Sequence, residues 1–188
     1  MLANLLPESV SLTVEEYLVL EEVSLERHEY ISGQLRAMAG GTLAHDRIAN
    51  TIRAALDAHL GDGPCGVYGP DVRLRIGESI SYYPDAMVIC DEMEAPGDEE
   101  VSVSVPRLAV EVLSDRTEAI DRGDKFADYQ SLPSCAEYLL VSARRRGVEC
   151  FRRAAAGFWT YQRYSPDEAL TLGAFVCPVA ALYRRTRL

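Results

Sequence analysis

The spacing of hydrophobic and polar residues predicts the elements of the first third of the chain. Thr13 followed by Glu16 is a capping-box signature, so a short helix is expected to begin there. The segment "RHEYISGQLRAMAG" predicts two short strands that turn at Ser32-Gly33. In "LAHDRIANTIRAALDAHLGDG" apolar residues recur at helical spacing, and the run from Gly61 to Pro64 is expected to end this second helix.

The rest of the pattern predicts mainly strands. "GVYGPDVRLRIG" and "SYYPDAMVIC" each predict one strand, and "RLAVEVLS" predicts a third after an acidic loop, "DEMEAPGDEEVS". "DRTEAIDRGDKFADYQSL" predicts a helix, "AEYLLVSARRRGVECFRRA" a hairpin and "GFWTYQRYS" a further strand. This order predicts a single α/β or α+β domain over residues 1–188, with a mixed central sheet flanked by helices.

Composition narrows the class of protein. The chain has 188 residues, of which 48% are hydrophobic, enough for one sizeable core. Its apolar runs fall short of the roughly 18 residues that cross a membrane, and its start has no basic segment followed by a long apolar one. We therefore expect a cytoplasmic protein without a membrane partner. The five cysteines include no C-x-x-C pair and predict buried thiols rather than a disulfide framework or a zinc ribbon.

Two acidic residues interrupt strands whose other residues are typical of a buried sheet. Asp85 follows Pro84 at the start of one strand, and Glu111 stands in the middle of "AVEVLS". A carboxylate in such a place is costly unless it is paired, protonated or bound to a metal. Lys125, the only lysine among 19 basic residues, follows on the next helix. Two acids on separate strands with a lysine nearby fit a Mg²⁺ site, in which the ammonium orients water or offsets charge on phosphorus.

Several blocks of the sequence resemble one known family. "YYPDAMVIC", "PRLAVEVLS" and "DRGDKFADYQSLPSCAEYLLV" are similar to the Uma-two family of endonucleases in the PD-(D/E)xK superfamily. So are "TVEEYLVLEEVSLERHEYISGQLRAMAGGTLAHDRIAN" and "PCGVYGPDVRLRI". The resemblance covers roughly residues 12 to 160, in several separate blocks that keep the family's order.

The resemblance implies a fold and a chemistry. It implies a restriction-endonuclease-like mixed sheet, Asp85 and Glu111 as ligands of Mg²⁺ or Mn²⁺, and hydrolysis of phosphodiester bonds in DNA. The superfamily lysine stands two residues after the glutamate, where this chain has Leu113, so the resemblance implies that Lys125 takes its place from the following helix. Because cleavage of two strands normally uses two active sites, we expect a homo-oligomer, with a dimer favoured.

Three further residues are candidates for the site. Glu29 in "RHEYISG" is a possible acidic ligand, and His45 stands near a helix N-terminus, where anions are favoured. Asp71 repeats the Pro-Asp pair of Asp85 and is either a carboxylate behind the ligands or a turn residue.

A purely structural role also remains open for two of the main candidates. Asp85 alone could cap a turn, and Lys125 could be an exposed helix residue paired with Asp121 or Asp128. Arg144, Arg145 and Arg146 either steer DNA phosphates or form a solvated turn.

Two other functions also remain open. One is a nuclease fold that binds nucleic acid or itself with little catalysis, which the net charge of −10 favours somewhat. The other is a metal-dependent hydrolase of small phosphate esters. A basic groove beside the site would favour nucleic acid over a small substrate.

Overall fold

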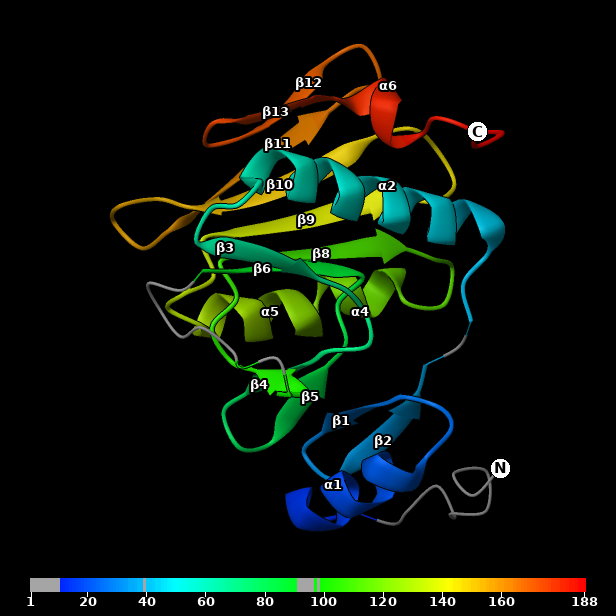
Figure 1. The fold of residues 1–188 in the computed structure, drawn as a ribbon, viewed down its shortest axis with the longest axis vertical. Coiled ribbons are helices and arrows are strands. Elements are labelled where there is room, and N and C mark those ends of the chain that lie inside the picture. The colour runs from blue at the N-terminus through cyan, green and yellow to red at the C-terminus, as the bar shows by residue number, and fades with distance from the viewer. Residues whose placement is uncertain (1–10, 39, 91–96, 98) are drawn as a thin grey trace.

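The computed structural model describes residues 11–38, 40–90, 97 and 99–188 (Figure 1). Its helices are α1 (Val14–Val23), α2 (Leu43–Leu60), α4 (Glu118–Arg122), α5 (Asp124–Ser131) and α6 (Val179–Leu182). Its first strands are β1 (His28–Ile31), β2 (Gln34–Ala37), β3 (Cys65–Tyr68), β4 (Arg73–Ile76), β5 (Ile80–Tyr82), β6 (Ala86–Cys90) and β7 (Ser102–Val103). The remaining strands are β8 (Leu108–Leu113), β9 (Glu137–Ser142), β10 (Val148–Arg153), β11 (Trp159–Tyr164), β12 (Ala169–Leu172) and β13 (Phe175–Pro178).

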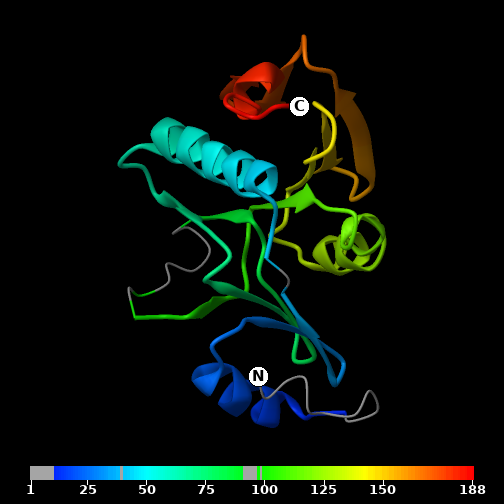
Figure 2. The ribbon, with the colours of Figure 1, turned by 90° about the vertical axis from the view of Figure 1, so that its right-hand side faces the viewer.

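A mixed six-stranded sheet forms the centre of the molecule, in the order β11-β10-β9-β8-β6-β3. The β8–β9 pair is parallel and the other pairs are antiparallel. Helix α2 covers one face, where Ile48, Ile52 and Leu56 pack against the strands, and α4 and α5 lie on the other (Figure 2). The predicted mixed sheet flanked by helices is confirmed.

A second sheet, β2-β1-β5-β4-β7, carries the N-terminal elements, and β12 and β13 form a small ribbon. The capping box of Thr13 and Glu16 is present at the start of α1. The predicted turn at Ser32-Gly33 joins β1 to β2 with positive φ angles of 48° and 96°. This backbone conformation matches the twist of a two-residue hairpin, which is why the sequence pattern could predict it.

Three predicted elements are each divided in two. "SYYPDAMVIC" forms β5 and β6, which belong to different sheets, because Pro84 has no N–H to continue a strand ladder. "GVYGPDVRLRIG" likewise forms β3 and β4 with a turn between them. The predicted helix after β8 breaks at Gly123, whose ψ of −93° is not helical. The expected acidic loop lies largely outside the described residues.

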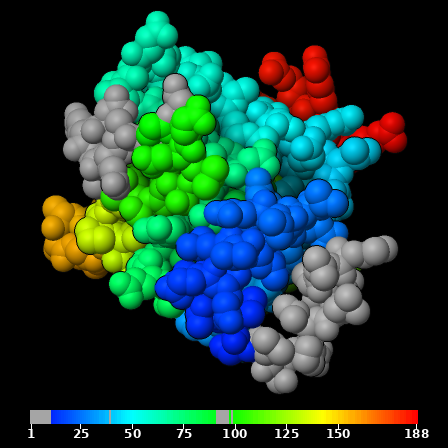
Figure 3. All heavy atoms as spheres, turned by 60° about the horizontal axis from the view of Figure 1, so that its bottom comes forward, coloured from blue at the N-terminus to red at the C-terminus, as the bar shows by residue number. Residues whose placement is uncertain are grey.

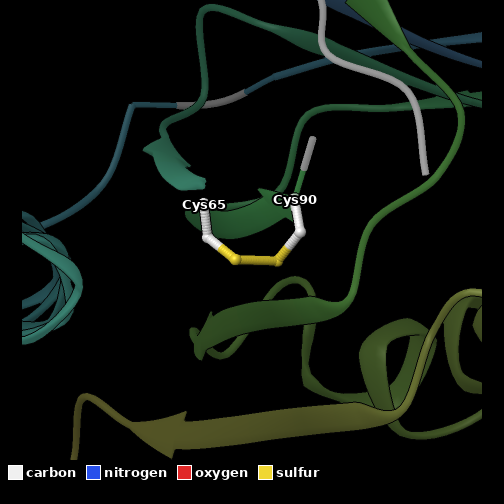
Figure 4. The surroundings of a disulfide bond; sticks show 2 residues. All are labelled: Cys65 and Cys90. Atoms are coloured by element: carbon white, nitrogen blue, oxygen red, sulfur yellow. A yellow bond between two sulfur atoms is a disulfide. The ribbon is translucent and has the colours of Figure 1, made fainter. Parts of the chain in front are cut away.

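The prediction of five unpaired cysteines is wrong for two of them. Cys65 and Cys90 face each other in the β3–β6 register and form a disulfide with a Cα–Cα distance of 4.0 Å (Figure 4). They are 25 residues apart, so no local spacing motif announces a pair that only strand register creates. Cys135, Cys150 and Cys177 are buried and free, as predicted. No helix in the described part of the chain is long and apolar enough to cross a membrane.

Candidate active site

Strand register brings the two predicted acids to the same face of the central sheet. In the β6–β8 pair, Ala86 lies opposite Val110 and Met87 opposite Ala109, so one further step in register sets Asp85 opposite Glu111. Directly opposed residues of antiparallel strands point to one face. Asp85 Oδ2 accepts a hydrogen bond of 2.7 Å from the N–H of Val112. The strand therefore holds Asp85 in place beside Glu111.

Alternation along β8 explains why Glu111 faces α4 and α5. Val110 and Val112 belong to the core under α2, whereas Ala109 and Leu113 belong to the core on the opposite face. Because side chains alternate along a strand, Glu111 points to the same face as Ala109 and Leu113. Leu113, at the position of the superfamily lysine, is only 3% exposed and packs in the core.

Lys125 reaches this site from α5. Its Nζ lies 2.7 Å from Glu29 Oε1, 3.1 Å from Glu111 Oε1 and 3.3 Å from Asp121 Oδ1. The alternative of an exposed lysine is wrong, because the Lys125 side chain is 5% exposed. The pairing with Asp121 that this alternative invoked does exist, but it is buried inside the site.

Neighbouring aromatic and basic groups hold this ammonium–carboxylate cluster in place. Tyr129 donates a 2.8 Å hydrogen bond to Glu111 Oε1, and the Tyr82 ring lies 5.1 Å from the Lys125 ammonium. Arg36 pairs with the other oxygen of Glu29 at 3.5 Å. We refer to Glu29, Glu111, Asp121 and Lys125 together as the lysine cluster.

The lysine cluster contains more carboxylates than cations. Burial raises the pKa of Glu111 well above its ordinary value, although Lys125 opposes the shift, and burial acts in the same way on the pKa of Asp121. Burial disfavours the charged form of Lys125, but the surrounding carboxylates, Glu111 first, outweigh it and raise the lysine pKa. Asp121 Oδ1 is buried, and among the described residues its one partner is Lys125, in an ion pair without hydrogen-bond geometry. The cluster therefore keeps its ammonium charged and favours additional positive charge.

His45 lines the same pocket as Lys125 and lies in the first turn of α2. Its Nε2 is 3.3 Å from Asp85 Oδ2, and its backbone N–H donates to the capping hydroxyl of Thr42. Burial alone would lower the pKa of His45, but the hydrogen bond to Asp85 raises it above the ordinary value. The N-terminus of α2 and a histidine biased towards its charged form both favour an anion here.

One pocket of about 630 Å³ contains most of the predicted site residues. Its lining includes Glu29, His45, Asp85, Glu111 and Lys125. Asp71 does not join them: it is exposed in the turn between β3 and β4, which agrees with the turn interpretation of the second Pro-Asp pair.

Two residues that line this pocket, Asp121 and Arg36, were not among the predicted site residues. The sequence could have identified Asp121, since it precedes the only lysine by one helical turn. It could not have identified Arg36, because the place of Arg36 beside Glu29 depends on the β1–β2 register.

The donor groups fit a hard divalent cation that keeps part of its water shell. Within the described residues, the side-chain contacts of Asp85 all involve Oδ2 and those of Glu111 all involve Oε1. One oxygen of each carboxylate is therefore available to a ligand. No three His, Cys, Asp or Glu residues of this part of the chain converge as a complete metal site. Mg²⁺ commonly binds through one or two carboxylates and water, so two suffice.

A second buried polar cluster lies beside the pocket. Glu21 on α1 accepts hydrogen bonds from the N–H of His28 at 3.0 Å and from Tyr83 at 2.8 Å, and its other oxygen lies 3.0 Å from His28 Nδ1. Tyr17 donates to the carbonyl of His28. We refer to Tyr17, Glu21, His28 and Tyr83 as the glutamate–histidine cluster.

Comparison with known proteins identifies one family for this chain. The family Uma2, described as "Putative restriction endonuclease", matches residues 14–179. The protein named "Uncharacterized protein slr1290", from Synechocystis sp. PCC 6803, is 36% identical over 162 residues, which are 86% of this chain and 84% of that protein. "Uncharacterized protein sll1609", from the same organism, is 35% identical over 149 residues, which are 79% of this chain and 84% of that protein.

A solved structure has the same fold. It is described as a "putative nuclease belonging to DUF820" from Anabaena variabilis and has a TM-score of 0.75 at 16% identity. The match covers 92% of this chain and 97% of that one. At this level of identity the likeness establishes the fold alone.

Proposed function

The chain belongs to the Uma2 family of putative restriction endonucleases, and from this membership we propose that it is a Mg²⁺-dependent endonuclease that hydrolyses phosphodiester bonds in DNA. One observation carries the proposal: the only lysine of the chain lies 3.1 Å from Glu111 in the pocket that also contains Asp85. Asp85 and Glu111 are the proposed metal ligands, and Lys125 is the proposed catalytic cation.

Mg²⁺, or Mn²⁺ in its place, would bind the available oxygens of Asp85 and Glu111. When bound, such an ion supplies Lewis-acid activation of water and neutralises charge on the phosphate. The residual negative charge of the lysine cluster supports this assignment, because a divalent cation would offset the carboxylate charge that Lys125 and Arg36 together leave unbalanced.

The chain's own groups position the reacting atoms. The Lys125 ammonium stays protonated. Glu29 and Glu111 accept hydrogen bonds from two of its three N–H groups, and the third is directed at the attacking water or at the phosphate oxygen that gains charge. Water oxygen bonds to phosphorus and gives up a proton to solvent, while the bond to the leaving sugar oxygen breaks and that oxygen takes up a proton from solvent. His45 and the N-terminus of α2 bind a non-bridging phosphate oxygen. Glu29 and Asp121 are positioning residues that fix Lys125.

Cleavage of supercoiled plasmid tests the proposal. Wild-type protein is incubated with Mg²⁺, Mn²⁺, Ca²⁺ or EDTA, beside Asp85→Asn and the matched control Asp71→Asn, which changes the other Pro-Asp pair outside the pocket. We expect Mg²⁺- or Mn²⁺-dependent nicking that falls by roughly 100-fold or more in Asp85→Asn and is unchanged in Asp71→Asn. Equal cleavage by wild type and Asp85→Asn would contradict the assignment.

Calorimetric titration with Mn²⁺ tests the metal assignment separately. Binding should disappear in Glu111→Gln, and binding that survives would remove Glu111 from the ligand set. Metal binding with hydrolysis of p-nitrophenyl phosphate, but not of DNA, would favour a small phosphate ester as substrate. Metal binding without hydrolysis of either would favour the non-catalytic module. We further propose a homodimer, which light scattering during gel filtration would detect.

A further inference from the structure

Seven exposed arginines from three separate segments gather beside the pocket. They are Arg47 at the start of α2, Arg144, Arg145 and Arg146 in the β9–β10 turn, and Arg184, Arg185 and Arg187 in the C-terminal segment. We refer to them as the arginine surface. In Figure 2 the C-terminal segment, the β9–β10 turn and the start of α2 lie together on the side that faces the viewer. Figure 3 also shows the C-terminal segment, in red, next to the start of α2.

Specific hydrogen bonds join the three segments. The Tyr183 hydroxyl donates to the carbonyl of Gly147 at 2.7 Å and accepts from its N–H at 3.0 Å, which ties the C-terminal segment to the β9–β10 turn. Arg47 donates to the carbonyl of Arg185 at 2.6 Å, which ties the same segment to α2. Arg185 has a φ of 67°, a conformation that non-glycine residues adopt only when their surroundings enforce it. These contacts hold the segments in a built arrangement.

Carboxylates leave most of these clustered guanidinium groups unpaired among the described residues. Within the described residues, the only ion pair of the arginine surface joins Arg144 to Asp115. A chain with a formal net charge of −10 thus leaves six arginines of one surface without an acidic partner among those residues. Such an arrangement is costly in repulsion and is typical of a surface that binds an anionic polymer.

We propose that the arginine surface binds the phosphate backbone of DNA next to the scissile phosphate. The bound stretch is the one that runs out of the pocket past Arg144. The inference rests on the proposed function and extends it to the path of the substrate. Arg144 lines the pocket together with His45, and Arg47 lies two residues after His45 on α2. A strand whose scissile phosphate lies at the pocket therefore has its neighbouring phosphates over the arginine surface. Guanidinium groups suit this ligand because they bind phosphate oxygens through paired N–H groups.

The experiment compares two sets of three substitutions of equal charge. The test protein carries Arg145→Gln, Arg146→Gln and Arg184→Gln, which lie outside the pocket lining. The control carries Arg27→Gln, Arg75→Gln and Arg107→Gln, all exposed, outside the pocket lining and outside the three segments of the arginine surface. Binding of a short labelled DNA duplex is measured by fluorescence anisotropy in EDTA at several salt concentrations. Hydrolysis of bis(p-nitrophenyl) phosphate is measured in parallel with Mn²⁺.

We expect the test protein to bind DNA about tenfold or more weakly, with a salt slope smaller by roughly 0.9 for each phosphate group that the substituted arginines would otherwise bind. The control should bind as wild type does, and the small diester should be hydrolysed equally by all three proteins. Equal DNA binding by test and control proteins, or no DNA binding by wild type, would overturn the inference. Tighter binding of wild type to poly-glutamate than to DNA would also overturn it, in favour of an acidic protein partner.

The two arms separate failure of the inference from failure of the proposed function. Hydrolysis of the small diester without an effect of the three substitutions on DNA binding would leave the chemistry standing and remove the arginine surface. Selective loss of DNA binding by a protein that cleaves neither substrate would support the surface and contradict the endonuclease.

Discussion

Two buried polar clusters share strand β1, and they differ in how their charges balance. His28 belongs to the glutamate–histidine cluster, and Glu29, the next residue, belongs to the lysine cluster. Both clusters are almost inaccessible, with Glu21 2% and Glu111 4% exposed. In the first, one carboxylate accepts three contacts from neighbouring donors, and only His28 Nε2 lacks a partner among the described residues. In the second, three carboxylates surround one ammonium.

This difference separates a structural cluster from a candidate catalytic one. A buried carboxylate whose oxygens receive donors supports the fold, and it gains nothing from a ligand. Buried carboxylates without a balancing cation lower the stability of the folded protein. The raised pKa values of Glu111 and Asp121 reflect this unfavourable charge. We infer that α1 and Tyr83 stabilise the wall of the pocket. The lysine cluster, in contrast, carries excess negative charge that a bound cation would neutralise.

Removal of the cation from the lysine cluster should have the largest effect. In Lys125→Met three buried carboxylates lose their shared partner, and we expect a cost of about 3–5 kcal/mol at neutral pH together with loss of cleavage. Urea denaturation at neutral and acidic pH checks this, because protonation of the carboxylates should make the cost smaller in acid. Adding Asp121→Asn to Lys125→Met should recover part of the stability. A pH-independent cost that Asp121→Asn does not relieve would refute the charge imbalance.

Removal of one carboxylate should affect the two clusters in opposite ways. Glu21→Gln deprives donors of their acceptor and should destabilise the protein by about 1–3 kcal/mol while cleavage remains within a few-fold of wild type. Glu111→Gln should abolish cleavage with unchanged or increased stability, because it removes a surplus charge. Chemical denaturation and the plasmid assay on both variants measure the contrast. If both variants lost stability and activity alike, the distinction between the clusters would fail.

The raised pKa values also predict how stability changes with pH. A carboxyl whose folded pKa exceeds its unfolded value binds more protons in the folded state, so stability falls as pH rises from the ordinary pKa to the raised one. The raised pKa of His45 acts in the same direction over its own range above 6.5. Each group contributes at most about 1.4 kcal/mol per pH unit. Asp121→Asn should flatten this slope, as midpoints of urea denaturation from pH 5 to 8 would show.

The helix cap and the hairpin turn of this fold can be predicted from the sequence. Thr13 with Glu16 fixes the start of α1, and Ser32-Gly33 fixes the first hairpin, because a cap and a two-residue turn depend on neighbouring residues alone. The position of Glu111 among apolar residues marks a buried acid, and the uniqueness of Lys125 marks its partner.

Features that arise from register and from crossing between sheets could not be predicted. Pro84 marks a break within "SYYPDAMVIC", but no local residue indicates which sheet each half joins, and this crossing sets Asp85 opposite Glu111. The Cys65–Cys90 disulfide depends in the same way on the β3–β6 register. The arginine surface unites segments more than 130 residues apart, such as Arg47 and Arg185, whose contact spans 138 positions.

The smallest expected effect concerns His45, which lines the pocket from the first turn of α2. A Cβ atom at Gly41 would lie 2.8 Å from His45 Nδ1, so Gly41→Ala should push the ring and weaken its 3.3 Å contact with Asp85. Gly40→Ala is the matched control, because a Cβ there would meet no atom of the described residues within 4 Å. Both changes reduce the freedom of the unfolded chain equally, so stability should agree within about 0.5 kcal/mol. Cleavage should fall roughly several-fold in Gly41→Ala alone, since small displacements of a positioning group slow catalysis. Equal rates for the two variants would show that His45 has no part in the reaction, whereas equal losses of stability and rate would show that the segment serves only the fold.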